Sequence, residues 1–129
     1  MQDINQLTEH VIGLAITVHR ILGPGFLESV YQEALAYELK QASISFEREK
    51  EMPVPYESMV LDVGFRCDFL IEKQLIVECR AVRHLLPIDQ AQTLNYLKCS
   101  DLQVGLLLNF HVMQLADGGL NKIVNGFKG

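Results

Sequence analysis

Two runs of alternating apolar residues, separated by a short polar break, constrain the fold more than any other feature of the chain. The runs are Phe65–Ile71 and Leu75–Ala81, and the break is Glu72–Gln74. Alternation with a period of two is typical of β-strands, and a break of three residues is short enough for a hairpin loop. The sequence therefore predicts an antiparallel β-hairpin with Ile71 opposite Leu75.

The register of this hairpin predicts which side chains share a face. Counting outward from the loop gives three further pairs: Leu70 with Ile76, Phe69 with Val77, and Asp68 with Glu78. One face is apolar and is expected in the core: Phe65, Cys67, Phe69, Ile71, Leu75, Val77 and Cys79. The other face carries the charged side chains and two apolar ones: Arg66, Asp68, Leu70, Ile76, Glu78 and Arg80.

Asp68 and Glu78 are thus predicted side by side, since directly opposed residues in a sheet have Cβ atoms about 4.5–5.5 Å apart. Two carboxylates at that separation repel each other, and in a partly buried pair without a metal we expect at least one raised pKa. A divalent cation relieves the repulsion, and oxygen ligands suit Mg²⁺ or Mn²⁺ better than zinc. The alternative is a solvated sheet face on which Arg66 and Arg80 neutralise the two acids.

Helix-like and strand-like periodicities follow each other along the rest of the chain. Apolar residues at three- and four-residue steps predict helices over three segments: Ile4–Leu22, Leu27–Gln41 and Pro87–Ser100. Strand patterns occur in six segments: Ile44–Arg48, the stretch around Pro53 and Pro55, Val60–Ile71, Leu75–Val82, Val104–Phe110 and Lys122–Asn125. The order α-α-β-β-β-β-α-β-β predicts an α/β fold in which a central mixed sheet is flanked by helices.

Length and composition limit the classes of protein that the chain can belong to. The 129 residues, 49% of them hydrophobic, suit one domain spanning residues 1–129. The formal net charge of -5 excludes a generally basic nucleic-acid-binding surface, although not a local basic groove. The N-terminus lacks the features of a secretory signal, and no apolar run reaches the roughly 18 residues of a membrane span. Three scattered cysteines fit neither a disulfide scaffold nor a CxxC zinc site. We therefore expect a cytoplasmic protein with no membrane partner.

Several short motifs occur in order along nearly the whole chain. They are Gly25–Tyr31 (GFLESVY), the strand with Asp68, Glu78–Arg80 (ECR), Gln92–Tyr96 (QTLNY), Gly105–Phe110 (GLLLNF) and Ile123–Phe127 (IVNGF). In these motifs the chain resembles the family named for its GxxExxY motif, within the PD-(D/E)XK nuclease-like superfamily.

The resemblance implies a restriction-endonuclease-like fold and the cleavage of nucleic acid phosphodiesters with Mg²⁺ or Mn²⁺. It implies that Asp68 and Glu78 bind the metal, since they match the superfamily's two metal-binding acids. Glu28 resembles a helix carboxylate that some members add to the metal site. Its other interpretation is a first-turn acid that interacts with the helix dipole. Gln92 and Tyr96 match a QxxxY element that several of these nucleases place beside the active site.

Arg80 stands where the superfamily has a lysine, and this departure bears on catalysis. A lysine there can share a proton with the attacking water or stabilise developing charge. Arginine, with a pKa above about 12, stays protonated and can do only the second. Cys67 also replaces the proline that often precedes the first acid. Both differences predict weakened catalysis.

Three functions follow from these residues, and they leave open whether the chain is an enzyme. The first is a metal-dependent nuclease-like protein whose catalytic residues are Asp68, Glu78, Arg80, Gln92 and Tyr96. The second is a non-catalytic binding or assembly module on the same fold. The third is a structural homo-oligomer built on the apolar first helix.

Overall fold

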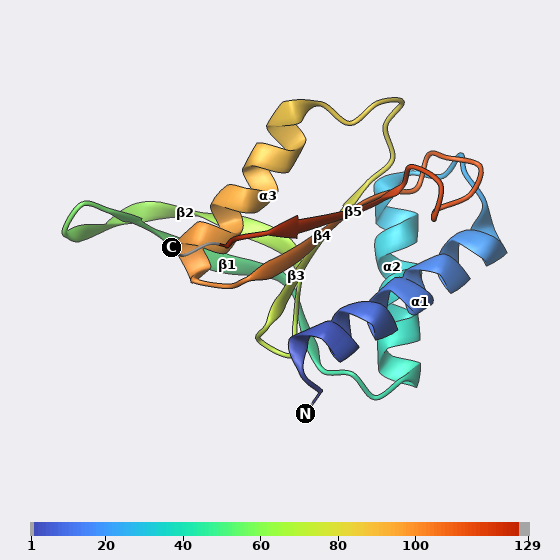
Figure 1. Cartoon of the computed structure of the whole chain (residues 1–129), viewed down its shortest axis with the longest axis horizontal. Helices are drawn as coiled ribbons and strands as arrows, with labels where there is room; N and C mark the ends of the chain where they lie inside the picture. Colours follow the sequence, from blue (N-terminus) through green and yellow to red (C-terminus); the bar gives the residue numbers. More distant parts are fainter. Residues whose placement is uncertain (1, 127–129) are drawn as a thin grey trace.

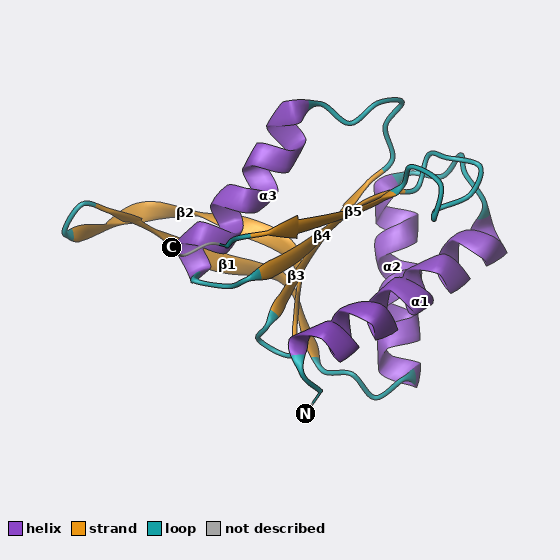
Figure 2. Ribbon diagram, in the orientation of Figure 1, coloured by secondary structure: helices purple, strands orange, loops and turns teal. Residues whose placement is uncertain are grey.

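The computed structural model describes residues 2–126, and within them a five-stranded mixed sheet has helices on both faces (Figure 1, Figure 2). The helices are α1 (Ile4–Leu22), α2 (Glu28–Gln41) and α3 (Pro87–Ser100). The strands are β1 (Phe46–Tyr56), β2 (Met59–Ile71), β3 (Leu75–Arg80), β4 (Val104–Asn109) and β5 (Leu120–Val124). Helices α1 and α2 cover one face of the sheet and α3 lies on the other, which confirms the predicted α/β fold. Phe127, which ends the IVNGF motif, lies outside the described residues.

One long strand takes the place of the two strands expected between residues 44 and 55. β1 pairs antiparallel with β2 along its whole length, and its register shifts between Pro53 and Pro55. Proline lacks the N–H group that a ladder needs, so it is tolerated in an edge strand and at a bulge. The two prolines therefore distort β1 without dividing it, and the predicted order contained one strand too many.

The connection between β3 and β4 decides which elements meet near the charged residues. Strands follow one another across the sheet in chain order, and β3 and β4 run parallel while the other neighbours are antiparallel. Parallel neighbours need a crossover connection, and here α3 provides it. The parallel register sets Arg80 opposite Asn109, at the ends of the two strands.

The hairpin of β2 and β3 has the register that its alternation predicts. Ile71 pairs with Leu75, Leu70 with Ile76 and Phe69 with Val77. Five of the seven residues expected on the apolar face do pack under α1 and α2: Phe69, Ile71, Leu75, Val77 and Cys79.

The other two residues of that face, Phe65 and Cys67, lie on the opposite side of the sheet, so their predicted position is wrong. Both pack in the smaller cluster under α3. The change of side occurs at Asp68, opposite which Glu49 of β1 has a φ of 49°. A left-handed residue within a strand breaks the regular pleat. Strand β2 therefore turns a different set of side chains to α3 before Asp68 than its alternation predicts.

The turn between α1 and α2 explains two of the three motif residues in GFLESVY. Gly23 ends α1 with a φ of 71°, and Gly25 has a φ of 111°, conformations that favour glycine. Tyr31 is buried, stacks on Phe110 with ring centroids 4.4 Å apart, and donates a hydrogen bond to the Gly23 carbonyl oxygen at 2.6 Å. Gly25 and Tyr31 thus shape the turn and the core, which leaves Glu28 as the motif residue with a role to assign.

The apolar face of helix α1 packs against the core of its own chain. Leu7, Val11, Ala15 and Val18 are buried in the main core. This is the surface on which a homo-oligomer was expected, so the apolar pattern of α1 is explained by its own core packing. Among residues 2–126, no helix is both long and apolar enough to cross a membrane.

Candidate active site

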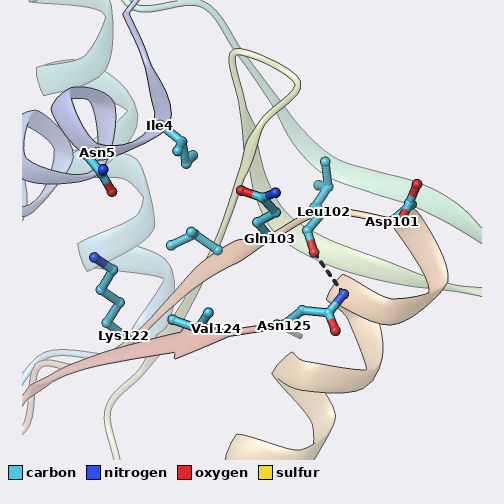
Figure 3. Close-up of a pocket in the computed structure, with 10 residues that line it drawn as sticks. Ile4, Asn5, Asp101, Leu102, Gln103, Lys122, Val124 and Asn125 are labelled. Atoms are coloured by element: carbon cyan, nitrogen blue, oxygen red, sulfur yellow. Dashed lines mark hydrogen bonds between the residues drawn. The ribbon is translucent and has the colours of Figure 1, made fainter. Parts of the chain in front are cut away.

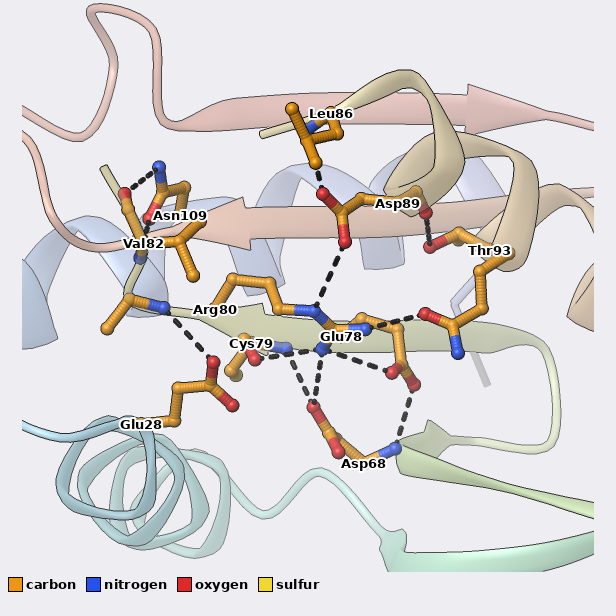
Figure 4. A network of polar contacts seen from close by, with 12 residues as sticks. Glu28, Asp68, Glu78, Cys79, Arg80, Val82, Leu86, Asp89, Thr93 and Asn109 are labelled. Carbon is orange, nitrogen blue, oxygen red and sulfur yellow. Dashed lines mark hydrogen bonds and ion pairs between the residues drawn. The ribbon is translucent and has the colours of Figure 1, made fainter. Parts of the chain in front are cut away.

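Asp68 and Glu78 lie where the β2–β3 ladder ends, and their side chains replace its next hydrogen bonds (Figure 4). The Asp68 backbone N–H donates to Glu78 Oε2 at 2.8 Å. The Cys79 backbone N–H donates to Asp68 Oδ2, also at 2.8 Å. The two strands are therefore bridged by carboxylates at this point, and the hairpin register places the acids together as predicted.

Arg80 lies against both acids. Its Nη1 atom is 3.5 Å from Glu78 Oε1 and 3.7 Å from Asp68 Oδ2. Arg66, by contrast, is 60% exposed and faces Glu49 and Glu51. The alternative in which Arg66 helps to neutralise the acid pair is therefore wrong, and Arg80 alone of the two arginines takes that position.

Burial and mutual repulsion raise the proton affinity of the acid pair. Glu78 is only 2% exposed, and burial followed by the charge of Asp68 raises its pKa to about 8. Burial also raises the pKa of Asp68, although its hydrogen bond from Cys79 and the charge of Arg80 oppose that shift. These directions agree with the raised pKa expected for a partly buried pair without a metal.

Helix α3 contributes Gln92 and Tyr96 to the site, and they form a chain of hydrogen bonds that starts at Arg80. Arg80 Nη2 donates to Gln92 Oε1 at 2.9 Å, and Gln92 Nε2 donates to the Tyr96 hydroxyl at 2.8 Å. The Tyr96 ring stacks on Phe65, with centroids 4.0 Å apart. Gln92 thus contacts the charged cluster directly, whereas Tyr96 packs on the sheet and reaches Arg80 through Gln92.

Glu28 approaches the cluster from α2, on the other side of β3 (Figure 4). Its Oε2 atom accepts a hydrogen bond from the Ala81 backbone N–H at 3.4 Å, one residue beyond Arg80. In residues 2–126, no three or more His, Cys, Asp or Glu side chains are grouped so that they could share a metal ion. A metal-binding role for Glu28 therefore stays a prediction.

Sequence reasoning missed Asp89 and Asn109. Asp89 Oδ1 lies 4.0 Å from Arg80 Nε, and Asp89 Oδ2 accepts a hydrogen bond from the Leu86 backbone N–H at 2.8 Å. Asn109 is 4% exposed, and its amide makes two hydrogen bonds to the Val82 backbone and one to the His111 N–H. Two signals in the sequence could have found them. Asp89 is an acid in the first turn of a predicted helix, and Asn109 is the one amide residue at the end of an otherwise apolar strand.

Replacement of Asn109 by alanine is expected to lower the free energy of unfolding by about 2–3 kcal/mol, because three partly buried hydrogen bonds from its side chain to the Val82 and His111 backbone are lost. Urea denaturation measures the change. Asn121→Ala is the matched control, since the half-buried Asn121 makes one hydrogen bond, to the Leu107 carbonyl oxygen, and should cost about 1 kcal/mol or less. Equal losses in the two variants would contradict the role assigned to Asn109.

A separate open depression of about 760 Å³ lies between the start of α1, the turn after α3 and strand β5 (Figure 3). Its polar lining includes Asn5, Gln103 and Lys122, and the Asn125 side chain donates to the Leu102 carbonyl oxygen at 3.1 Å. None of the predicted site residues lines it. Its size therefore gives no reason to move the candidate site away from the acid pair.

The fold and the cluster define an α/β protein with paired acids at the open end of a central hairpin, and a comparison with solved structures agrees with that fold. The crystal structure of SSO0001 matches with a TM-score of 0.57 and 19% sequence identity, over 78% of this chain and 50% of that chain. This likeness shows the fold, and the present chain spans half the length of that structure. A comparison with curated proteins found no match.

The family is shown by sequence. A profile of the PD-(D/E)XK nuclease superfamily matches residues 5–122. The chain therefore belongs to the PD-(D/E)XK nuclease superfamily.

Proposed function

We propose that this protein is a divalent-metal-dependent nuclease-like protein that acts on nucleic acid phosphodiesters. The observation that carries the proposal is the arrangement of Asp68, Glu78 and Arg80. Two carboxylates from adjacent strands lie within 4 Å of one guanidinium, at the point where the ladder between the strands opens. Membership of a nuclease superfamily supports the same activity.

The donor set fits a hard divalent cation. Asp68 and Glu78 offer carboxylate oxygens, the ligands that Mg²⁺ and Mn²⁺ prefer. Because Glu78 is buried beside a second carboxylate, its ionised form is disfavoured and it holds a proton up to about pH 8, and a bound cation would take the place of that proton. Asp68 and Glu78 would hold the cation, with Glu28 as a further ligand to test. The cation would supply a Lewis acid and lower the pKa of a bound water.

The remaining residues act on the substrate without exchanging protons. The Arg80 guanidinium stays protonated and can stabilise negative charge that develops on a phosphoryl oxygen. Gln92 accepts from Arg80 and donates to Tyr96, so it orients the guanidinium from the α3 side. The cluster thus has the parts for charge stabilisation and lacks a lysine at position 80 for proton transfer.

The charge of the chain limits how a nucleic acid would bind. Non-specific affinity for nucleic acid depends on the number of phosphates that Lys and Arg neutralise. With a net charge of -5, the protein is expected to bind long nucleic acids weakly and to depend on local contacts around the cluster.

The test is a Mn²⁺-dependent cleavage assay on single-stranded, duplex and branched substrates. Wild-type protein is expected to cleave slowly and only with the metal, and Asp68→Asn should abolish cleavage because it removes a ligand charge. Glu51→Gln is the matched control, since Glu51 is 77% exposed and faces Arg66. Cleavage that survives Asp68→Asn would contradict the metal-binding role of Asp68. Absence of cleavage together with absence of Mn²⁺ binding would favour the non-catalytic binding or assembly module.

A further inference from the structure

The guanidinium of Arg80 makes its short contacts away from the two acids. Its hydrogen bonds run to Gln92 Oε1 at 2.9 Å and to the Cys79 carbonyl oxygen at 3.1 Å. The separations of 3.5 and 3.7 Å from Glu78 and Asp68 exceed the usual 2.7–3.2 Å or so of an N–H···O bond. Arg80 therefore compensates the charge of the acids through longer contacts than those it makes to Gln92 and Cys79.

Two acceptors on α3 are already oriented toward this guanidinium. The hydrogen bond from Gln92 Nε2 to Tyr96 directs Gln92 Oε1 to Arg80. The Leu86 N–H holds one oxygen of Asp89, which leaves Oδ1 facing Arg80 Nε at 4.0 Å. A shift of the guanidinium toward α3 would shorten the Asp89 contact and keep the bond to Gln92.

A cation held by both acids would lie close to Arg80. Magnesium binds its oxygen ligands at about 2.0–2.1 Å, so an ion shared by Asp68 and Glu78 must lie close to oxygens that Nη1 already approaches within 3.7 Å. Like charges a few ångströms apart repel strongly, and more so where burial lowers the local dielectric. Arg80 is 17% exposed in its side chain, so solvent screens this repulsion only in part.

We propose that Arg80 is a built-in competitor of the divalent cation: it compensates the acid pair in the metal-free protein and withdraws toward Asp89 and Gln92 when the cation binds. The proposal rests on the metal site of the proposed function and adds a regulation of that site. Cation affinity is then set by how easily the guanidinium moves to α3.

The experiment is a titration with Mn²⁺ alone, followed by calorimetry and by the electron paramagnetic resonance signal of free Mn²⁺. Arg80→Met removes the charge and keeps an unbranched chain, so it should tighten Mn²⁺ binding by about tenfold or more. Arg66→Met is the matched control and should bind like wild type, because Arg66 faces Glu49 and Glu51. Equal or weaker binding by Arg80→Met overturns the proposal.

A double-mutant cycle tests the withdrawal itself. Asp89→Asn should weaken Mn²⁺ binding by about threefold in the wild-type background, because the displaced guanidinium loses a charged partner. The same change should have a smaller effect in Arg80→Met, and an equal effect in both backgrounds would overturn the withdrawal. If Arg80→Met does not fold, Arg80→Lys carries the test, because its ammonium cannot contact Gln92 and Asp89 as a fork. Lysine keeps the competing charge without those contacts, so this variant should bind Mn²⁺ more weakly than wild type, and equal or tighter binding overturns the proposal.

The outcomes separate this inference from the proposed function. Tighter Mn²⁺ binding by Arg80→Met than by wild type, when wild type cleaves no substrate, supports the competition and contradicts the nuclease activity. Mn²⁺ binding and cleavage by wild type, with no gain in Arg80→Met, supports the nuclease and overturns the competition. Absence of Mn²⁺ binding in both proteins overturns both.

Discussion

Replacement of Glu78 by glutamine is expected to raise the free energy of unfolding at pH 9 by about 3–5 kcal/mol and to leave it nearly unchanged at pH 4. Burial and the neighbouring Asp68 raise the pKa of Glu78 from its ordinary value of 4.5 to about 8 in the folded protein. Each pKa unit corresponds to about 1.4 kcal/mol of stability. Glutamine carries no charge to bury, and its side-chain oxygen can still accept the hydrogen bond from the Asp68 N–H.

The sign follows from where the proton is bound. Between pH 4.5 and about 8 the folded protein holds a proton on Glu78 that the unfolded chain has lost. Wild-type stability from this residue is therefore fully present below pH 4.5, falls as the pH rises to about 8, and is level above. Asp68, whose pKa burial also raises, contributes in the same direction.

Urea denaturation of wild type and Glu78→Gln at pH 4, 6, 8 and 9 measures the difference. The control is Glu51→Gln, which removes a surface acid that is 77% exposed and should show no such pH dependence. A Glu78→Gln variant that is less stable than wild type at pH 9 would contradict the interpretation. It would mean that Arg80 and the backbone hydrogen bond stabilise the ionised carboxylate by more than burial costs.

Replacement of Arg80 by lysine is expected to raise the rate of Mn²⁺-dependent phosphodiester cleavage, by about 10²–10⁴-fold if proton transfer limits the wild-type reaction. Lysine keeps a positive charge next to Asp68 and Glu78 and can also exchange a proton, which arginine cannot do. The gain should depend on pH, since only the lysine variant acquires a group that titrates within an accessible range. Wild type should be slow at every pH.

Single-turnover cleavage rates from pH 6 to 10 provide the measurement. Arg66→Lys is the matched control, because Arg66 is exposed and faces Glu49 and Glu51. The double variant Glu78→Gln, Arg80→Lys should lose the gain, since it lacks a ligand charge. If Arg80→Lys is no faster than wild type and Mn²⁺ does not bind, the chain is better described as a binding or assembly module on a nuclease fold.

The sequence alone determined the centre of the sheet and the acid pair. Period-two alternation on both sides of Glu72–Gln74 leaves one register that buries Phe69, Leu75 and Val77 together, and the structure has that register. Counting outward from that register places Asp68 beside Glu78, and the structure joins them through the hydrogen bond from the Asp68 N–H to Glu78. These are local properties of one hairpin, which is why pattern and loop length were sufficient.

Only the tertiary structure decided what surrounds the pair. Beside the left-handed Glu49 of a neighbouring strand the regular pleat is interrupted, and Cys67 packs under α3 against the expectation from alternation. The link from Arg80 to Asp89 and Gln92 depends on where the crossover between two parallel strands lays α3 on the sheet. Contacts of this kind join residues through separate elements, and no spacing within a single segment encodes them.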